Sequence, residues 1–371
     1  MSRGAARALH VDALKAVASQ AIVLHHLAFY GPMADHAATL WPALFDAMAG
    51  DARIAVQVFL VVAGWLAARS LAPDGRLRDG VRAGAALLER YLRLVLPLAA
   101  TLVLAIGAAA LARAWMDHPS IPAPPTAAQV LAHLLLLQDL LGVEALSAGV
   151  WYVAIDLQLY ALLLVLLLAA RAIVPARRAA HVPTSACVAA GLVFALTAAS
   201  LLAINRDAAW DVTGPYFFGA YGMGVLVAWW ARPHAVRARG LVLLAGVVVV
   251  ALWLHWRSRI ALAALVALGL AVAPQLAARG AMRARGPADV VHALGRISYA
   301  VFLVHYPLCL VVNAAFERFA PHTPTVQAAG VLLGWAGSVA AGALFHRAVE
   351  APAMRWVSAL KSRRARGTAG G

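Results

Sequence analysis

VDALKAVASQAIVLHH, at residues 11–26, is the stretch that decides how the chain folds. It is apolar enough to enter a membrane, yet it carries an acid, a base and two histidines. A helix advances about 100° per residue, which places four of its polar side chains within roughly 60° of one another: Asp12, Lys15, Ser19 and His26. His25 points away from this polar stripe. Ionisable groups inside a membrane span are costly and usually face a cavity, so the stripe is a candidate functional site that ends in His26. The alternative is a structural histidine near the end of a helix.

The composition places the whole chain in a lipid bilayer. Of its 371 residues, 63% are hydrophobic and 13% are charged, and the mean hydropathy is +0.80. Soluble domains are about half apolar and a quarter charged. The net charge of +15 would suit nucleic acid if the basic residues formed one folded patch, but they lie in short loops between apolar runs, so we expect no nucleic-acid partner. Cys187 and Cys309 provide neither a disulfide framework nor a metal-ligand spacing, and we expect no metal site.

The apolar segments predict an all-α polytopic protein with about ten transmembrane helices and both termini in the cytoplasm. Each segment is long enough, or nearly so, to cross about 30 Å of hydrocarbon. We expect spans at residues 10–30, 54–72, 94–114, 151–170, 185–204, 214–231, 240–255, 260–277, 295–315 and 326–346. The chain has 31 Lys and Arg residues, and this topology puts all but six of them on the inner side, as the positive-inside rule requires. The six outer ones are Arg53, Arg113, Arg206, Arg257, Arg259 and Arg318.

Residues 127–141 are apolar but too short to span, so we interpret them as an outer-face interfacial or re-entrant helix. The loops are too short to bury a core of their own. The chain is therefore predicted to form one membrane domain at residues 1–356, followed by a basic, disordered cytoplasmic tail at 357–371.

Further polar residues lie in or near the predicted spans. Arg90 and Arg93 are three apart and share a helix face, where they could hold a phosphate at the cytoplasmic mouth of a cavity, although the positive-inside rule alone also explains them. Asp156 lies within the fourth span, and a buried carboxylate needs a partner such as a histidine or an arginine. His305 lies in the ninth span, seven residues after Ser298 and therefore on the same face. A lone histidine in a membrane helix can also be structural.

The order of these motifs resembles the acyltransferase-3 family of integral membrane O-acyltransferases. Asp12-x-x-Lys15 followed by His26 is similar to the family's first-helix signature, and Phe59 to Gly64 is similar to its second-helix motif Phe-Phe-x-x-Ser-Gly. Four later matches follow in the same order: Arg90-x-x-Arg93 with Pro97, Trp151 to Tyr160, Gly295-x-Ile297-Ser298-Tyr299 with His305, and Glu350-x-Pro352. The resemblance covers residues 9 to 356.

This resemblance implies transfer of an acyl group, most simply acetyl, from cytoplasmic acyl-CoA to a hydroxyl of a carbohydrate-containing acceptor at the outer face. His26 would act as general base or transient acyl carrier. Asp12 would fix Lys15, while Lys15, Arg90 and Arg93 would hold CoA phosphates or stabilise oxyanion charge. Asp156 and His305 would orient the acceptor or pair helices. Acyl-CoA is a substrate here, and no cofactor is expected to stay bound. The expected location is the bacterial cytoplasmic (inner) membrane.

The chain departs from the family pattern at several positions. Lys15 replaces an arginine, Leu60 and Ala63 replace a phenylalanine and a serine, and Asp156 replaces a glutamate. Two other classes of protein could carry similar residues. A proton-coupled secondary transporter also buries His, Asp and Lys, but it usually contains paired broken helices in repeated halves, and no such repeat is found. A noncatalytic scaffold would not need the polar stripe.

Overall fold

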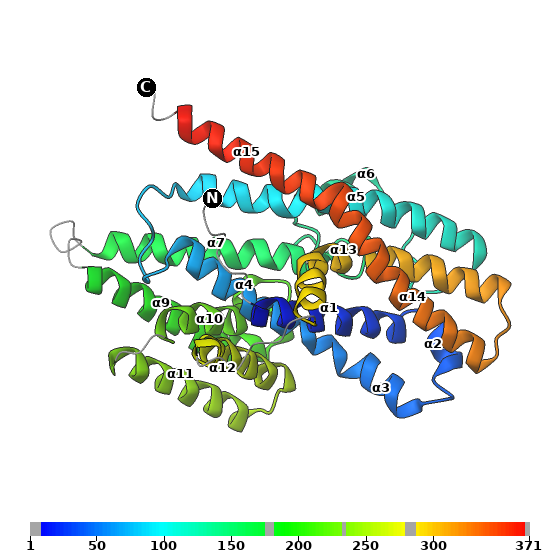
Figure 1. Cartoon of the computed structure of the whole chain (residues 1–371), viewed down its shortest axis with the longest axis horizontal. Coiled ribbons are helices and arrows are strands. Elements are labelled where there is room, and N and C mark those ends of the chain that lie inside the picture. The colour runs from blue at the N-terminus through cyan, green and yellow to red at the C-terminus, as the bar shows by residue number, and fades with distance from the viewer. Residues whose placement is uncertain (1–8, 175–181, 232–234, 279–286, 368–371) are drawn as a thin grey trace. The chain divides into compact units, whose positions relative to one another are not determined.

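The computed structural model describes residues 9–174, 182–231, 235–278 and 287–367. Within these ranges every regular element is a helix, which confirms the all-α prediction (Figure 1). The chain divides into two compact units. Unit 1 comprises residues 1–15, 54–88 and 155–292, and unit 2 comprises residues 16–53, 89–154 and 293–371.

Six helical segments in the described ranges are long and apolar enough to cross a membrane. They are Pro42–Leu71, Ala83–Trp115, Val150–Ile173, Thr184–Arg206, Ala288–Phe319 and Pro324–Ser362. Helix α1 (Leu9–Phe29) is long enough at about 1.5 Å per residue, but its Asp, Lys, Gln and His residues lower its hydropathy. These helices are those of a polytopic membrane protein, and the number of ten spans stays a prediction.

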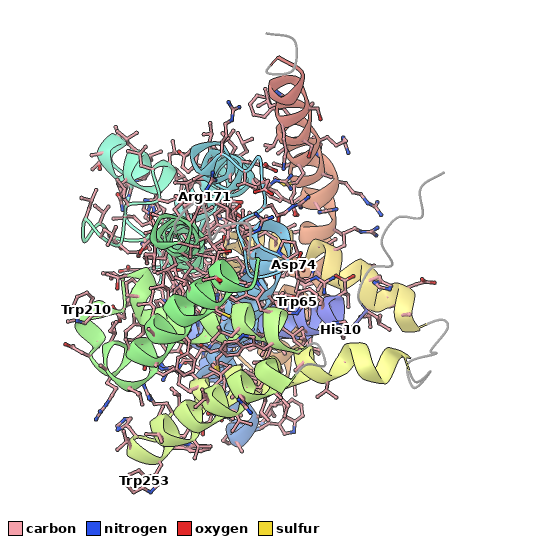
Figure 2. The ribbon with its side chains drawn as sticks, turned by 90° about the vertical axis from the view of Figure 1, so that its left-hand side faces the viewer. His10, Trp65, Asp74, Arg171, Trp210 and Trp253 are labelled. Carbon is pink, nitrogen blue, oxygen red and sulfur yellow. The ribbon has the colours of Figure 1, made fainter. Side chains whose placement is uncertain are left out.

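Apolar side chains on the outside of the helices suit contact with lipid. On α11 (Ala235–Leu254), Val242 and Val249 are exposed and Trp253 is 82% exposed. Trp210 is exposed as well, and both tryptophans lie at the periphery of the side chains in Figure 2. A soluble protein seldom exposes so much continuous apolar surface.

Unit 1 is built around α10 (Gly214–Trp230), which is buried along almost its whole length. It packs against α4 (Val56–Leu71), α9 (Val182–Leu202) and α12 (Ser258–Ala278) (Figure 1). The backbones of α4 and α10 approach closely because each helix has a glycine at the crossing. A Cβ at Gly64 would collide with the carbonyl of Tyr221, and a Cβ at Gly224 would collide with the carbonyl of Val61.

This crossing explains the small residues at the end of the 59–64 motif. Small residues let a neighbouring backbone approach closely, and in the structure the neighbour of Gly64 is the α10 backbone. The motif therefore contributes helix packing to unit 1.

Unit 2 contains α2 (Pro32–Ala37), most of α13 (Pro287–Phe319) and α14 (Pro324–Phe345). Its core includes Val23, Leu27, Met33, Val301 and Cys309. Helix α13 continues through Pro307, just as α5 (Ala83–Trp115) continues through Pro97. Neither proline ends its helix.

The segment at 127–141 is shorter as a helix than its apolar composition suggests. Helix α6 (Ala127–Leu134) starts at a capping box in which Thr126 and Gln129 exchange hydrogen bonds. It is too short to cross a membrane, at about 1.5 Å per residue. His133 donates from Nδ1 to the Gln129 carbonyl (2.8 Å) and accepts at Nε2 from the Leu146 N–H (3.1 Å). Burial lowers the pKa of His133, so both hydrogen bonds are made by the neutral ring.

Residues 357–367, which the sequence predicted to be disordered, are helical, and residues 368–371 lie outside the described ranges. Helix α14 runs into a π-helical turn at His346–Glu350, and α15 (Ala351–Gly367) follows directly. Residues 357–367 are rich in Ala, Lys and Arg, which favour helices, and this explains the correction. The remaining elements are α3 (Pro42–Gly50), α7 (Val150–Ile173), and the 3₁₀ turns η1 (Ala52–Ala55), η2 (Ile204–Arg206) and η3 (Ala208–Trp210).

Candidate active site

Two histidines from distant parts of the sequence meet in unit 2. His26, in the last turn of α1, places Nδ1 2.5 Å from Nε2 of His305 on α13. The planes of the two rings are nearly parallel, at an angle of 16°, and their centroids are 4.8 Å apart. His305 is fully buried, whereas His26 keeps 7% of its surface exposed. Of the two histidines, His26 is therefore the one that a substrate could reach.

The hydrogen bonds assign a tautomer to each neutral ring. His305 Nδ1 lies 3.1 Å from the Val301 carbonyl, which can only accept, so Nδ1 of His305 carries the proton. Its Nε2 is then an acceptor, and His26 must donate to it from Nδ1. The proton of His26 is thereby held on Nδ1. Nε2 of His26 carries the lone pair that a general base or nucleophile needs.

Aromatic rings surround the pair. Tyr30 and Tyr306 meet the His26 ring edge to face, with centroids 5.3 and 6.2 Å away, and the Tyr306 hydroxyl donates to the Ser120 carbonyl at 2.6 Å. Phe302 lies 6.0 Å from the His305 ring by the same measure. These packed rings restrict rotation of both imidazoles, which keeps Nε2 of His26 in one position.

His25 has a different environment, as its place on the helix predicts. Its Nδ1 contacts the Met48 carbonyl at 3.3 Å, and its ring packs on Phe29 with centroids 5.5 Å apart. The Met48 carbonyl is an acceptor, so Nδ1 of His25 is a donor there. His25 is thus anchored to the chain before α4, while His26 is paired with His305.

The start of α1 carries a second polar cluster, which belongs to unit 1. Asp12 is buried and accepts from two partners, with Oδ1 3.0 Å from Lys15 Nζ and Oδ2 2.8 Å from His292 Nδ1. The contact with Lys15 is the one that their spacing of one helical turn predicts. Ser19 takes no part in this cluster, because its hydroxyl donates to the Ala16 carbonyl of its own helix.

The two candidate arginines near the start of α5, Arg90 and Arg93, belong to unit 2. Arg93 Nη2 donates to Glu89 Oε1 at 2.9 Å, and Lys361 Nζ of α15 lies 3.0 Å from Glu89 Oε2. One carboxylate is thus shared by two cations, which leaves a net positive charge. Arg90 is half-buried one turn before Arg93 on the same helix.

Comparison with known proteins decides the family. A family model described as an acyltransferase domain matches residues 9–344 of the chain. The chain belongs to the acyltransferase-3 family. Searches of curated proteins and of solved structures gave no match. Membership makes the chain an acyltransferase, and its long apolar helices make it an integral membrane protein.

Two other candidate residues of this acyltransferase are buried, one in each unit. Asp156 is buried on α7, in unit 1, so a shared site with His26 or His305 stays a prediction. Ser298 is buried too, and its hydroxyl donates to the Gly295 carbonyl at 3.0 Å rather than to a histidine.

Two features of the acyltransferase were not predicted from its sequence. His292 joins Asp12 from a helix far along the chain, and no spacing within either helix signals that contact. A cavity of about 180 Å³ in unit 1 is lined by Arg76, Arg171 and Ser185 among others (Arg171 is marked in Figure 2). Arg76 is paired there with Asp79 at 3.0 Å. In the sequence, Arg76 and Arg171 indicated only which side of the membrane their connections occupy. The fold brings both side chains to one cavity.

Proposed function

We propose that this acyltransferase moves an acyl group, most simply acetyl, from acyl-CoA to a hydroxyl of a glycan or glycoside, and that His26 acts on the reacting atoms. The observation that carries the proposal is the contact between Nδ1 of His26 and Nε2 of His305. It supports a neutral His26 whose Nε2 is free to accept a proton.

In the direct route, His26 Nε2 takes the proton of the acceptor hydroxyl while the oxygen attacks the thioester carbonyl carbon. The resulting tetrahedral intermediate expels CoA as its C–S bond breaks, and the thiolate takes the proton back from His26. The products are an ester and free CoA, and His26 returns to its starting state.

In the two-step route, His26 Nε2 attacks the thioester carbonyl carbon, the C–S bond breaks, and CoA leaves as its thiolate. The acceptor hydroxyl then attacks the acyl group on Nε2, the N–C bond breaks, and the hydroxyl proton passes to the CoA thiolate. His305 plays the same part in both routes. It holds the proton of His26 on Nδ1, and it accepts a hydrogen bond that strengthens when positive charge develops on His26. We therefore treat His305 as a positioning residue.

Cationic side chains would bind the donor. Lys15, Arg90 and Arg93 are assigned to the phosphates of CoA or to the oxyanion of the intermediate. Lys15 is oriented by Asp12, and Arg93 is oriented by Glu89. Asp156 is assigned to orienting the acceptor. The predicted topology brings acyl-CoA from the cytoplasm of a bacterial cell and puts the acceptor at the outer face of its inner membrane.

The test uses membranes that contain the full chain and acetyl-CoA labelled in its acetyl group. His26→Ala should reduce transfer of label to host glycans and glycolipids by about 100-fold or more, the usual contribution of a positioned base. His25→Ala is the matched control, because it removes the neighbouring imidazole and should change the rate only a few-fold. Thermal unfolding in detergent establishes that both variants are folded.

Two outcomes would overturn the proposal. Undiminished transfer by a folded His26→Ala variant would remove His26 from the chemistry. A second outcome would favour a secondary transporter. In that case the wild type would transfer no acyl group but would carry a proton-driven solute flux, and His26→Ala would lose this flux. Label that stays on the wild-type chain in the absence of acceptor, but not on His26→Ala, would identify the two-step route.

A further inference from the structure

Three potential metal ligands lie together in unit 2, and the acyl-transfer proposal uses none of them. They are His36 at the end of α2, Glu317 in the last turn of α13, and His322 in the connection from α13 to α14. We propose that His36, Glu317 and His322 bind one zinc ion. The sequence predicted no metal site, because His36 is far along the chain from the other two ligands.

The geometry of the cluster is close to that of a metal site. Each residue offers one ligand atom, and these three atoms lie within 4.8 Å of one another. Glu317 Oε2 is 3.6 Å from His322 Nε2, and the rings of His36 and His322 are stacked with centroids 5.0 Å apart. Ligands about 2.0–2.1 Å from a tetrahedral zinc ion are about 3.4 Å apart. Small side-chain rotations would therefore bring the three atoms to bonding distance.

An unsatisfied oxygen points to a missing ligand of the cluster. Oε2 of Glu317 is buried and has no hydrogen-bond partner among the described residues. Buried carboxylate oxygens are nearly always hydrogen-bonded or bound to a cation, because desolvation without a partner is costly. A zinc ion between Glu317 and the two imidazoles would satisfy this oxygen.

The ligand types select the metal. Two imidazoles and one carboxylate suit zinc, whereas calcium and magnesium prefer a shell made entirely of oxygen. Three protein ligands leave the fourth tetrahedral position for water. The main-chain carbonyl of Glu317 accepts from Nε2 of His322 at 3.0 Å. Zinc would replace this hydrogen bond, because Nε2 is the nitrogen of His322 that lies 3.6 Å from Glu317 Oε2.

The surrounding hydrogen bonds hold α2 in place for binding. Asn313, one turn before Glu317 on α13, accepts from the Met33 N–H at 3.3 Å and donates to the Tyr30 carbonyl at 3.2 Å. His36 lies one turn after Met33 on α2. The backbone of α2 is thus already fixed to α13 near the proposed ligands, so little ordering is needed when zinc binds. Zinc would add a second link between these two helices.

The experiment measures zinc binding by the full chain in detergent, with any affinity tag removed and bound metal stripped by a chelator. Titration with zinc chloride should give one ion per chain, and zinc should raise the midpoint of thermal unfolding. His36→Gln, Glu317→Gln and His322→Gln should each weaken zinc binding by about 10-fold or more and abolish the thermal shift. His255→Gln, which removes an exposed histidine elsewhere, should bind zinc like the wild type.

Calcium chloride is the second probe and should produce neither binding nor a thermal shift. The proposal is wrong if the wild type binds no more zinc than the three variants do, or if calcium binds as tightly as zinc. Because the readouts are stoichiometry and thermal unfolding, this result is independent of whether His26 proves to be the catalytic base.

Discussion

Nδ1 of His26 lies 2.5 Å from Nε2 of His305, although 279 positions separate the two residues in the chain. The contact joins α1 to α13 inside one compact unit and gives each histidine a different set of hydrogen bonds. Both ring nitrogens of His305 are hydrogen-bonded, to Val301 and to His26, whereas His26 is bonded through Nδ1. Substitutions of His305 can therefore test its proposed role separately from that of His26.

Replacing His305 tests its role as a positioning residue. His305→Leu removes the acceptor for His26 Nδ1–H, so the proton of His26 is free to move to Nε2. We expect kcat to fall by about 100-fold, with little change in KM for acetyl-CoA. His305→Gln can present an amide oxygen near the position of Nε2 and should recover part of the rate. Equal losses in the two variants, with both folded, would contradict the positioning role.

The Asp12 cluster predicts unequal effects for two similar ion pairs. Asp12→Asn leaves Lys15 without its buried counter-ion, which should cost about 3 kcal/mol of unfolding free energy and raise KM for acyl-CoA. The matched control is Asp79→Asn, since Asp79 pairs with Arg76 at the same i,i+3 spacing but is exposed. Thermal unfolding in detergent and donor titrations compare the two. Equal losses of unfolding free energy in the two variants would mean that burial of Asp12 does not strengthen its ion pair.

The crossing of α4 and α10 predicts strong intolerance of a single methyl group. Gly64→Ala drives its Cβ into the Tyr221 carbonyl and should cost about 3 kcal/mol, at the upper end for overpacking. Gly107→Ala on α5 has open space around the new Cβ, and it should stabilise the chain slightly through helix propensity. Gly64→Ala should unfold at a lower temperature than the wild type, and Gly107→Ala at a slightly higher one. The reverse order would disprove the packing of α4 against α10.

His133 predicts that the chain loses stability as the pH falls. Burial lowers the pKa of His133 below its ordinary value of 6.5, so below that pH the unfolded chain binds a proton that the folded ring does not. The unfolding midpoint should therefore drop between pH 7 and pH 5, and His133→Gln should reduce this drop. His255→Gln controls for the removal of a histidine as such. An unchanged pH dependence in His133→Gln would assign the loss to other groups.

The sequence was most informative where one helix contains the whole signal. Helical phase within α1 separated His26 from His25 and paired Asp12 with Lys15, because both depend only on the 3.6-residue period. The length of each apolar run located the long helices, because this signal also lies within a single helix. The polar residues that mark α1 also lower its hydropathy, so its motif identifies it better than its apolar length does.

Contacts between helices could not be predicted in this way. His292 meets Asp12, and Asn313 holds α2, through relationships that no period along one helix encodes. His305 was a candidate on motif grounds, yet its partner and tautomer follow only from the fold. The 59–64 motif ends in Gly64, but only the position of α10 shows which atoms lie against that glycine.

The π-helical turn at His346–Glu350 sets the rotational register of α15. A π turn holds one residue more than an α-helical turn, so winding the same five residues as a regular α-helix would turn α15 by about 100° relative to α14. Ser358 and Lys361, which contact Arg93 and Glu89, would then face elsewhere. The π turn beside Glu350-x-Pro352 therefore determines which face of the last helix meets Arg93 and Glu89 of α5.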